Sequence, residues 1–559
     1  MIGTMQDTPL TLPPLLDRAA ALFGEREIVS RRPDRSLERC SYRALAARVD
    51  ALARALLGAG LQPGDRVATL MWNQVEHLEA YFGIPLAGGV LHTLNLRLPV
   101  EHLVWIANDA ADRFLIVEES LLPLLEHWRS RAPFERIFVV RAPNLVSPVD
   151  PAAPPDPAVP LNPALPATPL RSGYEDYAGF LASAPSGLSF PVLAETAPCG
   201  LCYTSGTTGH PKGVLYTHRS SVLHCLGVAL VDSIGVSQRD SVLPVVPMFH
   251  VNAWGLPYAA VMVGAKLVLP GPHLDAVSLL DLCAGERVSL AAGVPSIWLG
   301  LLEALDREPG RWPLGHLRMI VGGAAAPISL IQGFDRHGLE LIHAWGMTET
   351  SPLGTVSRLA AGLESLSRAE RDRLRATQGL PVPLFETRIV ADGSPQPHDG
   401  RALGELEVRG PWVARAYFGA SDDPDRFTHD GWFRTGDVAN IDERGYVKLV
   451  DRIKDLVKSG GEWISSVELE NALMGHPGVR EAAVIAVPHP RWGERPLAVV
   501  VCKPGSTPSA DELRAHLAPQ FPKWWLPEAI VFSDAIPKTS AGKFLKTALR
   551  ERHSSWDWG

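Results

Sequence analysis

Hydrophobic and polar positions in the first 140 residues follow two alternating periods. Residues 41–60 (SYRALAARVDALARALLGAG) repeat apolar side chains at helical spacing, with Ser41 able to cap the start and Gly58 and Gly60 marking the end. A second helical run covers residues 74–86, and apolar runs of strand length stand around these helices: RVATLMW, VLHTL, FLIVE and RIFVV. Strands that alternate with helices predict right-handed crossovers and a mainly parallel sheet covered by helices.

The same alternation returns between about residues 200 and 343. Helical segments separate six apolar runs that we expect to be strands: GLCYT, VLPVV, KLVLP, VSLAAGVP, RMIVGG and LELIHAWG. After residue 378 the pattern changes to short alternating strands with Asp-Gly turns, which predicts a small antiparallel subdomain.

From residue 451 a loop rich in charge and glycine leads into a predicted helix over 466–474, three strands, and a C-terminal helix that starts near Lys543. The chain as a whole is therefore predicted to be an α/β protein. Residues 1–450 would form a large N-terminal domain of two α/β subdomains with mainly parallel sheets plus a small antiparallel β subdomain. Residues 451–455 would be a hinge, and residues 456–559 a small, mobile α+β lid domain.

Two segments depart from this alternation. Residues 241–265 contain no Asp, Glu, Lys or Arg and are long enough to cross a bilayer, but three prolines and the polar pair His250 and Asn252 favour a buried strand, a loop and a core helix. Residues 143–169 contain ten prolines, which predicts an exposed loop or linker. A passive spacer is favoured over a ligand for a proline-recognising partner.

Composition narrows the class of protein. The 559 residues are 46% apolar and 20% charged, as in folded globular proteins. With 53 Lys and Arg against 61 Asp and Glu, the net charge of -8 argues against a nucleic-acid partner but leaves room for a local basic site. Six cysteines are too sparse for a disulfide scaffold, and the first thirty residues show no secretory signal. We therefore expect a cytoplasmic protein without an integral membrane segment.

The strongest chemical signal is YTSGTTGHPKG at residues 203–213. Glycines let backbone N–H groups approach an anion, hydroxyls donate hydrogen bonds and the lysine adds positive charge, so the segment predicts a phosphate cradle. A Walker A loop cannot be aligned on it. The alternative is a linker rich in Gly, Ser and Thr, but a linker does not require this order or a Pro-Lys-Gly end.

This segment resembles the phosphate-loop signature of the adenylate-forming enzymes, the superfamily of acyl-CoA synthetases, luciferases and peptide-synthetase adenylation domains. Six further motifs stand in the order of that family: VPMFHVNAW, VGGAAAP, HAWGMTET, GWFRTGD, DRIKDLVKSGGEWISS and PKTSAGKFLK. The wording of HVNAW, SGGEWISSVELE and TSAGKFLK is most similar to the medium- and long-chain fatty-acyl-CoA synthetase branch.

The resemblance implies a two-step ligase that uses ATP, coenzyme A and Mg²⁺. A carboxylic acid, expected to be a medium- to long-chain fatty acid, would form acyl-AMP with release of pyrophosphate, and coenzyme A would then displace AMP. Two alternatives stay open: a ligase for a short, sulfur-containing (3-methylmercaptopropionate-like) or aryl acid, and a catalytically silent nucleotide-binding protein. Relatives are often dimers, so a homodimer is expected.

The resemblance also implies roles for individual residues. Lys543 is the expected adenylation lysine, because positive charge must meet the charge that develops on the α-phosphate. Lys454 is the expected hinge. His250 is expected to lie between the carboxylate and the coenzyme A entrance, and Val251 and Trp254 are expected to contact the acyl chain. Thr204 and Glu349 are the expected Mg²⁺ ligands. Gly460, Gly461 and Glu462 would face coenzyme A. The expected ATP and AMP contacts are Thr204, Ser205, Gly206, Thr207, Thr208, Gly209, Lys212, Gly323, His343, Ala344, Thr348, Asp437, Arg452, Lys458 and Trp463.

Overall fold

The computed structural model describes residues 3–141, 170–204, 210–420, 423–460, 462–538 and 544–558. Four predicted features lie outside these described residues: the proline-rich loop at 143–169, residues 205–209 of the phosphate cradle, Gly461 and Lys543.

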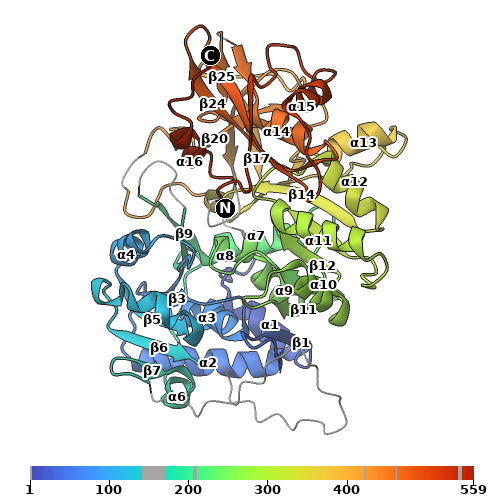
Figure 1. Cartoon of the computed structure of the whole chain (residues 1–559). Coiled ribbons are helices and arrows are strands. Elements are labelled where there is room, and N and C mark those ends of the chain that lie inside the picture. Colours follow the sequence, from blue (N-terminus) through green and yellow to red (C-terminus); the bar gives the residue numbers. More distant parts are fainter. Residues whose placement is uncertain are drawn as a thin grey trace.

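The first half of the chain folds around a seven-stranded sheet (Figure 1). Its strands in spatial order are β7 (Glu175–Asp176), β6 (Arg136–Val140), β5 (Asp112–Glu118), β3 (Arg66–Leu70), β4 (Val90–Thr93), β8 (Pro198–Tyr203) and β9 (Gly213–Thr217). All neighbours pair in parallel except β8 and β9, which confirms the mainly parallel sheet. The predicted helix after Ser41 is α2 (Tyr42–Gly58), and the Ser41 side chain caps it by accepting a hydrogen bond from the Ala44 N–H.

A nine-stranded sheet forms the second layer. Its order is β16 (Leu380–Pro381), β15 (Leu353–Val356), β14 (Glu340–Gly346), β13 (Arg318–Val321), β12 (Leu290–Gly293), β10 (Ser241–Pro244), β11 (Lys266–Leu269), β1 (Glu27–Arg31) and β2 (Leu37–Ser41). The strands from β14 to β1 are parallel. The grouping of GLCYT with this series is wrong, because that segment forms β8 in the first sheet beside β4. Local hydrophobic pattern predicts a strand but not its partner.

Helices fill the space between the sheets and cover their outer faces. One buried cluster joins Val67 and Phe114 of the first sheet to Val242 and Leu290 of the second. The helices are α1 (Pro13–Leu22), α2, α3 (Val75–Leu86), α4 (Val100–Asp109), α5 (Leu122–Glu126), α6 (Tyr177–Ala182), α7 (His218–Ala229), α8 (Val251–Trp254), α9 (Leu256–Val263), α10 (Ala276–Gly285), α11 (Pro295–Arg307), α12 (Ile328–Arg336) and α13 (Arg368–Arg375). Residues 241–265 thus form β10, a loop and short buried helices, as predicted.

Two mainly antiparallel sheets follow. The first is β18 (Ser394–Pro395), β17 (Glu386–Ala391), β19 (Gly404–Arg409), β20 (Phe433–Ile441) and β21 (Val447–Arg452), which confirms the predicted antiparallel subdomain. The second contains β23 (Glu462–Ile464), β22 (Val457–Ser459), β25 (Gly493–Cys502) and β24 (Val479–His489), with β26 (Ala529–Phe532) parallel to β25. It packs with α14 (Ser466–Met474), α15 (Ala510–Leu517) and α16 (Lys546–Arg552) into a C-terminal domain above the two large sheets (Figure 1). None of the helices among the described residues has both the length and the hydropathy that a bilayer span requires.

Candidate functional site

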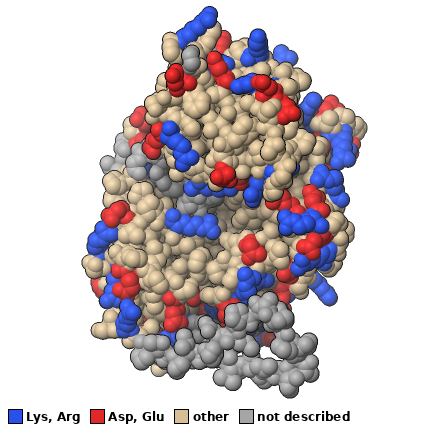
Figure 2. All heavy atoms as spheres, in the orientation of Figure 1, with Lys and Arg blue, Asp and Glu red and all other residues tan. Residues whose placement is uncertain are grey.

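One large cavity of about 590 Å³ lies where the first sheet, the second sheet and the β20–β21 hairpin meet. Figure 2 shows a hollow in the middle of the molecule below the C-terminal domain, with basic side chains at its rim. Of the predicted site residues, the cavity brings together Thr204, Lys212, His250, Val251, Trp254, Gly323, Ala344, Thr348, Glu349 and Arg452. Segments separated by almost 250 residues of chain therefore converge on one space.

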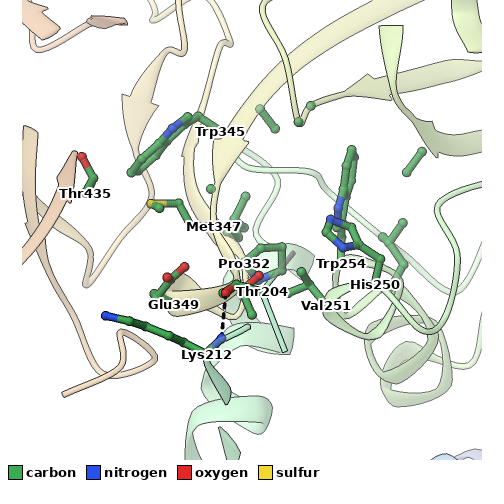
Figure 3. Close-up of a pocket in the computed structure, with 18 of the residues that line it drawn as sticks. Thr204, Lys212, His250, Val251, Trp254, Trp345, Met347, Glu349, Pro352 and Thr435 are labelled. Atoms are coloured by element: carbon green, nitrogen blue, oxygen red, sulfur yellow. Dashed lines mark hydrogen bonds between the residues drawn. The ribbon is translucent and has the colours of Figure 1, made fainter. Parts of the chain in front are cut away.

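The ends of the phosphate cradle are held by backbone pairing. The Thr204 N–H donates to the Lys212 carbonyl at 2.9 Å, and the Lys212 N–H donates to the Thr204 hydroxyl at 3.2 Å (Figure 3). These bonds continue the antiparallel pairing of β8 and β9 by one step and close the intervening loop. Next to it, the Trp105 ring stacks on His210 with centroids 4.8 Å apart.

A carboxylate and an ammonium group face the same aromatic ring beside the cradle. Glu349 is buried in the short 3-10 helix η3 (Thr348–Thr350), where its Oε1 accepts a hydrogen bond of 2.7 Å from the Tyr417 hydroxyl. The Lys212 ammonium lies 4.6 Å from the centre of the Tyr417 ring and 2.8 Å from a carboxylate oxygen of Asp423. Tyr417 thus contacts both charged groups, and Asp423 pairs with the ammonium group.

A second carboxylate, that of Asp437, is buried beside the cavity and does not line it, but it pairs with the lining residue Arg452. Asp437 on β20 lies directly opposite Arg452 on β21, which places the Arg452 Nε 3.0 Å from Asp437 Oδ1. The Trp345 indole N–H donates to Asp437 Oδ2 at 3.1 Å. Attraction by Asp437 raises the pKa of the Arg452 guanidinium. A buried carboxylate with a fixed orientation suits the binding of vicinal hydroxyls.

The opposite arm of the cavity is apolar. Val228, Ile234, Leu256, Ala292 and Ile320 line it, and the His250 and Trp254 side chains also line the cavity. The backbone that carries these two side chains is unusual, because four consecutive residues adopt left-handed φ values of 46°, 51°, 49° and 58° from Val251 to Trp254. Left-handed turns of non-glycine residues cost about 1–2 kcal/mol per residue, and such strain is concentrated at functional sites.

Gly322 completes the packing around Trp254. A Cβ atom at this position would lie 3.1 Å from the Trp254 ring and 2.9 Å from the Ala344 carbonyl oxygen. Glycine therefore lets the indole approach the end of β13 closely.

Other predicted residues lie away from the cavity lining. The His343 side chain is buried with its Nδ1 3.2 Å from the Ala376 carbonyl oxygen, and burial lowers its pKa to about 4. Lys454, Lys458, Gly460, Glu462 and Trp463 do not line the cavity, and Trp463 is 42% exposed with the Lys458 ammonium 4.5 Å from its ring centre. Assignments for Lys543, Gly461 and residues 205–209 fall outside the described residues.

Family models match most of the chain. The model described as AMP-binding enzyme covers residues 16–418, and that of the AMP-binding enzyme C-terminal domain covers residues 468–543. The chain belongs to the AMP-binding enzyme family. The first match includes the cradle, Glu349 and the apolar arm.

Two relatives align over nearly the whole length of this chain. A long-chain-fatty-acid--CoA ligase of Thermus thermophilus is 48% identical, and the match covers 100% of this chain and 98% of the relative. A 3-methylmercaptopropionyl-CoA ligase of Ruegeria pomeroyi is 46% identical, with 99% of each chain covered. Among solved structures, ATP-bound MatB from Rhodopseudomonas palustris superposes with a TM-score of 0.79 at 25% identity, covering 98% of this chain and 99% of that one.

The structure adds site residues of this AMP-binding enzyme that the sequence analysis did not select: Trp345, Tyr417, Asp423, Arg426 and Thr435. Trp345 stands on β14 in the HAWG segment, one of the motifs that carry the resemblance, and this position was its signal in the sequence. Tyr417 and Asp423 had none, because their roles depend on contacts with Glu349 and Lys212 that lie far away in the chain.

Proposed function

We propose that this protein is an AMP-forming acyl-CoA ligase that activates a medium- to long-chain fatty acid. A carboxylate oxygen of the acid attacks the α-phosphorus of ATP, the bond to pyrophosphate breaks, and acyl-AMP forms. The sulfur of coenzyme A then attacks the acyl carbonyl carbon, and AMP leaves. The observation that carries this proposal is one cavity that is lined by Thr204, Lys212, Glu349 and Arg452 and by an apolar arm, with the buried Asp437 paired to Arg452 beside it.

The geometry supports a division of labour within the cavity. Thr204, Lys212 and Thr348 would contact phosphates, and Asp437 would accept hydrogen bonds from the ribose hydroxyls with Arg452 assisting. Gly323 and Ala344 would line the adenine, while the His343 side chain would support that wall from behind, since it faces Ala376. These roles require the charged groups to be held in place before ATP arrives, which the Tyr417 and Asp423 contacts provide.

Mg²⁺ fits this site as an ion held mainly by phosphate and water. Glu349 contributes one carboxylate and Thr204 one hydroxyl, which is the small protein donor set that Mg²⁺ prefers when a nucleotide supplies the rest. Bound there, the ion would neutralise charge on the phosphates. No group of three or more His, Cys, Asp or Glu able to hold a metal occurs within the described ranges.

We also propose that residues 456–559 move as a lid on a hinge at residues 451–455 with Lys454 as pivot. The support is chemical: Lys543 would have to neutralise charge during acyl-AMP formation and then make way for the thiol. The β22–β23 hairpin, which carries Gly460, Glu462 and Trp463, would then present its exposed face to coenzyme A, with Lys458 and Trp463 near the nucleotide.

Acid preference follows from the apolar arm. Its wall of Val228, Ile234, Leu256 and Ile320 offers no charged partner, which favours an alkyl chain. The similarity to the Ruegeria ligase keeps a short, sulfur-containing acid as the second candidate. A catalytically silent nucleotide-binding protein is disfavoured, because Thr204, Lys212, Glu349 and Asp437 all stand in or beside the cavity.

The test is a panel of acids with purified protein, ATP, Mg²⁺ and coenzyme A, each omitted in turn. We expect saturated acids from octanoate to palmitate to be converted to acyl-CoA, AMP and pyrophosphate. The panel also contains 3-methylmercaptopropionate and cinnamate, which test the alternative substrates. Turnover of ATP to ADP, or the absence of acid-dependent pyrophosphate release with every acid of the panel, would overturn the proposal.

The proposal also includes a cytoplasmic homodimer. The six free thiols favour a reducing compartment, and light scattering would give the oligomeric state.

A further inference from the structure

A buried charged cluster connects the C-terminal domain to the large domain. Lys546, the first residue of α16, has only 10% of its side chain exposed, and its ammonium lies 2.7 Å from Glu470 Oε1 and 2.6 Å from the Ser466 hydroxyl. Glu470 is itself buried on α14 and also accepts a hydrogen bond of 2.7 Å from the Val484 N–H of β24. Within the C-terminal domain, Lys546 thus ties α16 to α14.

The same cluster reaches back to the end of β21. The Ser466 N–H and hydroxyl both donate to Asp451 Oδ2, at 2.6 and 2.5 Å, and Asp451 is 4% exposed. The neighbouring Ser465 hydroxyl donates to the Val450 carbonyl oxygen. Ser466 therefore bonds both to Asp451, which precedes the proposed pivot Lys454, and to the Lys546 ammonium group, which follows it.

These bonds are specific to one orientation of the two domains. Asp451 precedes Lys454 in the chain, whereas Ser466, Glu470 and Lys546 follow it. A rotation at Lys454 would carry the three later residues away from Asp451. In the present orientation no described residue beyond Arg452 lines the cavity, and the proposed coenzyme A face of the β22–β23 hairpin is turned outward. The cluster thus stabilises the present orientation of the two domains.

Charge explains why Lys546 is needed. Two buried carboxylates, Asp451 and Glu470, converge on the Ser466–Lys546 contact, and burial raises the pKa of both. Without the ammonium group they would be left without their shared counter-ion, which is costly inside a protein. Lys546 follows Lys543 by three residues in the chain. The N–H of Leu545, the residue before Lys546, donates to the Pro537 carbonyl oxygen at 2.8 Å.

We infer that Lys546 is a positioning residue for acyl-AMP formation: through Ser466, Asp451 and Glu470 it holds α16 against the end of β21, and so fixes the attachment of the segment that carries Lys543. This inference rests on the proposed function and on the proposed hinge. It assigns Lys546 no contact with substrate.

The experiment measures the two half-reactions separately in the full-length protein. Acid-dependent exchange of labelled pyrophosphate into ATP reports acyl-AMP formation, and acyl-CoA formed from supplied acyl-AMP reports thioester formation. We expect Lys546→Met to lower exchange by roughly ten- to hundredfold and to leave thioester formation within about twofold of wild type. Lys546→Arg, which keeps the charge, should recover most of the exchange activity.

A matched control comes from the large domain. Lys266 forms a Lys–Glu pair of the same length, 2.7 Å to the buried Glu286, far from the hinge. Lys266→Met should leave the ratio of the two half-reactions unchanged. Ser466→Ala, which introduces no buried charge, should shift that ratio in the same direction as Lys546→Met, by roughly three- to tenfold.

Three outcomes would overturn the inference and assign the cluster to stability alone. They are equal loss of both half-reactions in Lys546→Met, an unchanged ratio of the two half-reactions in Ser466→Ala, and unfolding of both variants seen by circular dichroism. Failure of the proposed function looks different, since wild-type protein would then show no acid-dependent exchange at all.

Discussion

Tyr417→Phe tests whether Glu349 acts from a fixed position. The substitution removes only the hydroxyl that donates to Glu349 Oε1 at 2.7 Å. The ring stays, so the contact between the Lys212 ammonium and the aromatic face, 4.6 Å from the ring centre, is retained. The change therefore isolates one hydrogen bond to one carboxylate.

The size of the effect follows from the charge of the acceptor. A hydrogen bond to a charged group contributes about 1.5–3 kcal/mol, and each 1.36 kcal/mol in a barrier is a tenfold change in rate. Because Glu349 is buried, water cannot fully replace the missing donor. We expect kcat for acid-dependent pyrophosphate exchange to fall by roughly ten- to hundredfold, and the Mg²⁺ concentration for half-maximal exchange to rise.

Tyr446→Phe is the matched control. Tyr446 is also buried and donates a hydrogen bond of 2.7 Å, but to the Arg358 carbonyl oxygen away from the cavity. Both variants should lose similar thermal stability, and only Tyr417→Phe should lose exchange activity. If the two variants keep equal exchange rates and equal Mg²⁺ dependence, Glu349 does not work from the position described.

Three further outcomes are expected. Lys543→Ala should abolish acyl-AMP formation while leaving thioester formation from supplied acyl-AMP nearly intact; equal loss in both assays would refute that division of labour. Trp254→Ala should open the end of the apolar arm next to Gly322, so that kcat/KM shifts toward longer acids. Because one methylene contact changes discrimination by about 1–3 kcal/mol, we expect kcat/KM for acids too long for the wild type to rise by roughly tenfold or more. An unchanged chain-length profile would show that the indole does not limit the arm. Burial lowers the pKa of His77, His218 and His343 from 6.5 to about 4, so the folded state holds these side chains neutral. As the pH falls below 6.5 the unfolded state takes up protons that the folded state does not, and the free energy of unfolding decreases. Lowering the pH from 7 to 5 should cost about 2 kcal/mol for each, measured as a fall in Tm, and a constant Tm over this range would contradict that reasoning.

The elements of the fold were predictable where local pattern decides them. The helix after Ser41 begins at its cap, and the helix predicted over residues 466–474 is α14 (Ser466–Met474). Sheet membership was not predictable, because β8 reads like a strand of the second series and pairs instead with β4. The small strands β1 and β2, which close the edge of the second sheet, have no local feature that names their partner.

The site shows the same division. Thr204, Glu349 and Arg452 were selected from three separate motifs and all line one cavity, and their roles there stay predictions. The Tyr417 hydroxyl donates a hydrogen bond to Glu349, which lies 68 positions away in the chain, and no local pattern encodes that contact. The side-chain direction of His343 likewise depends on the loop around Ala376 that packs against β14.

The exchange of labelled pyrophosphate into ATP, measured with a series of saturated fatty acids before coenzyme A is added, tests the central claim most directly. The account predicts exchange that depends on the acid and on Mg²⁺, followed by one acyl-CoA and one AMP for each pyrophosphate once coenzyme A is present. Exchange that is independent of the acid, or its absence with every acid in a well-folded preparation, would contradict it.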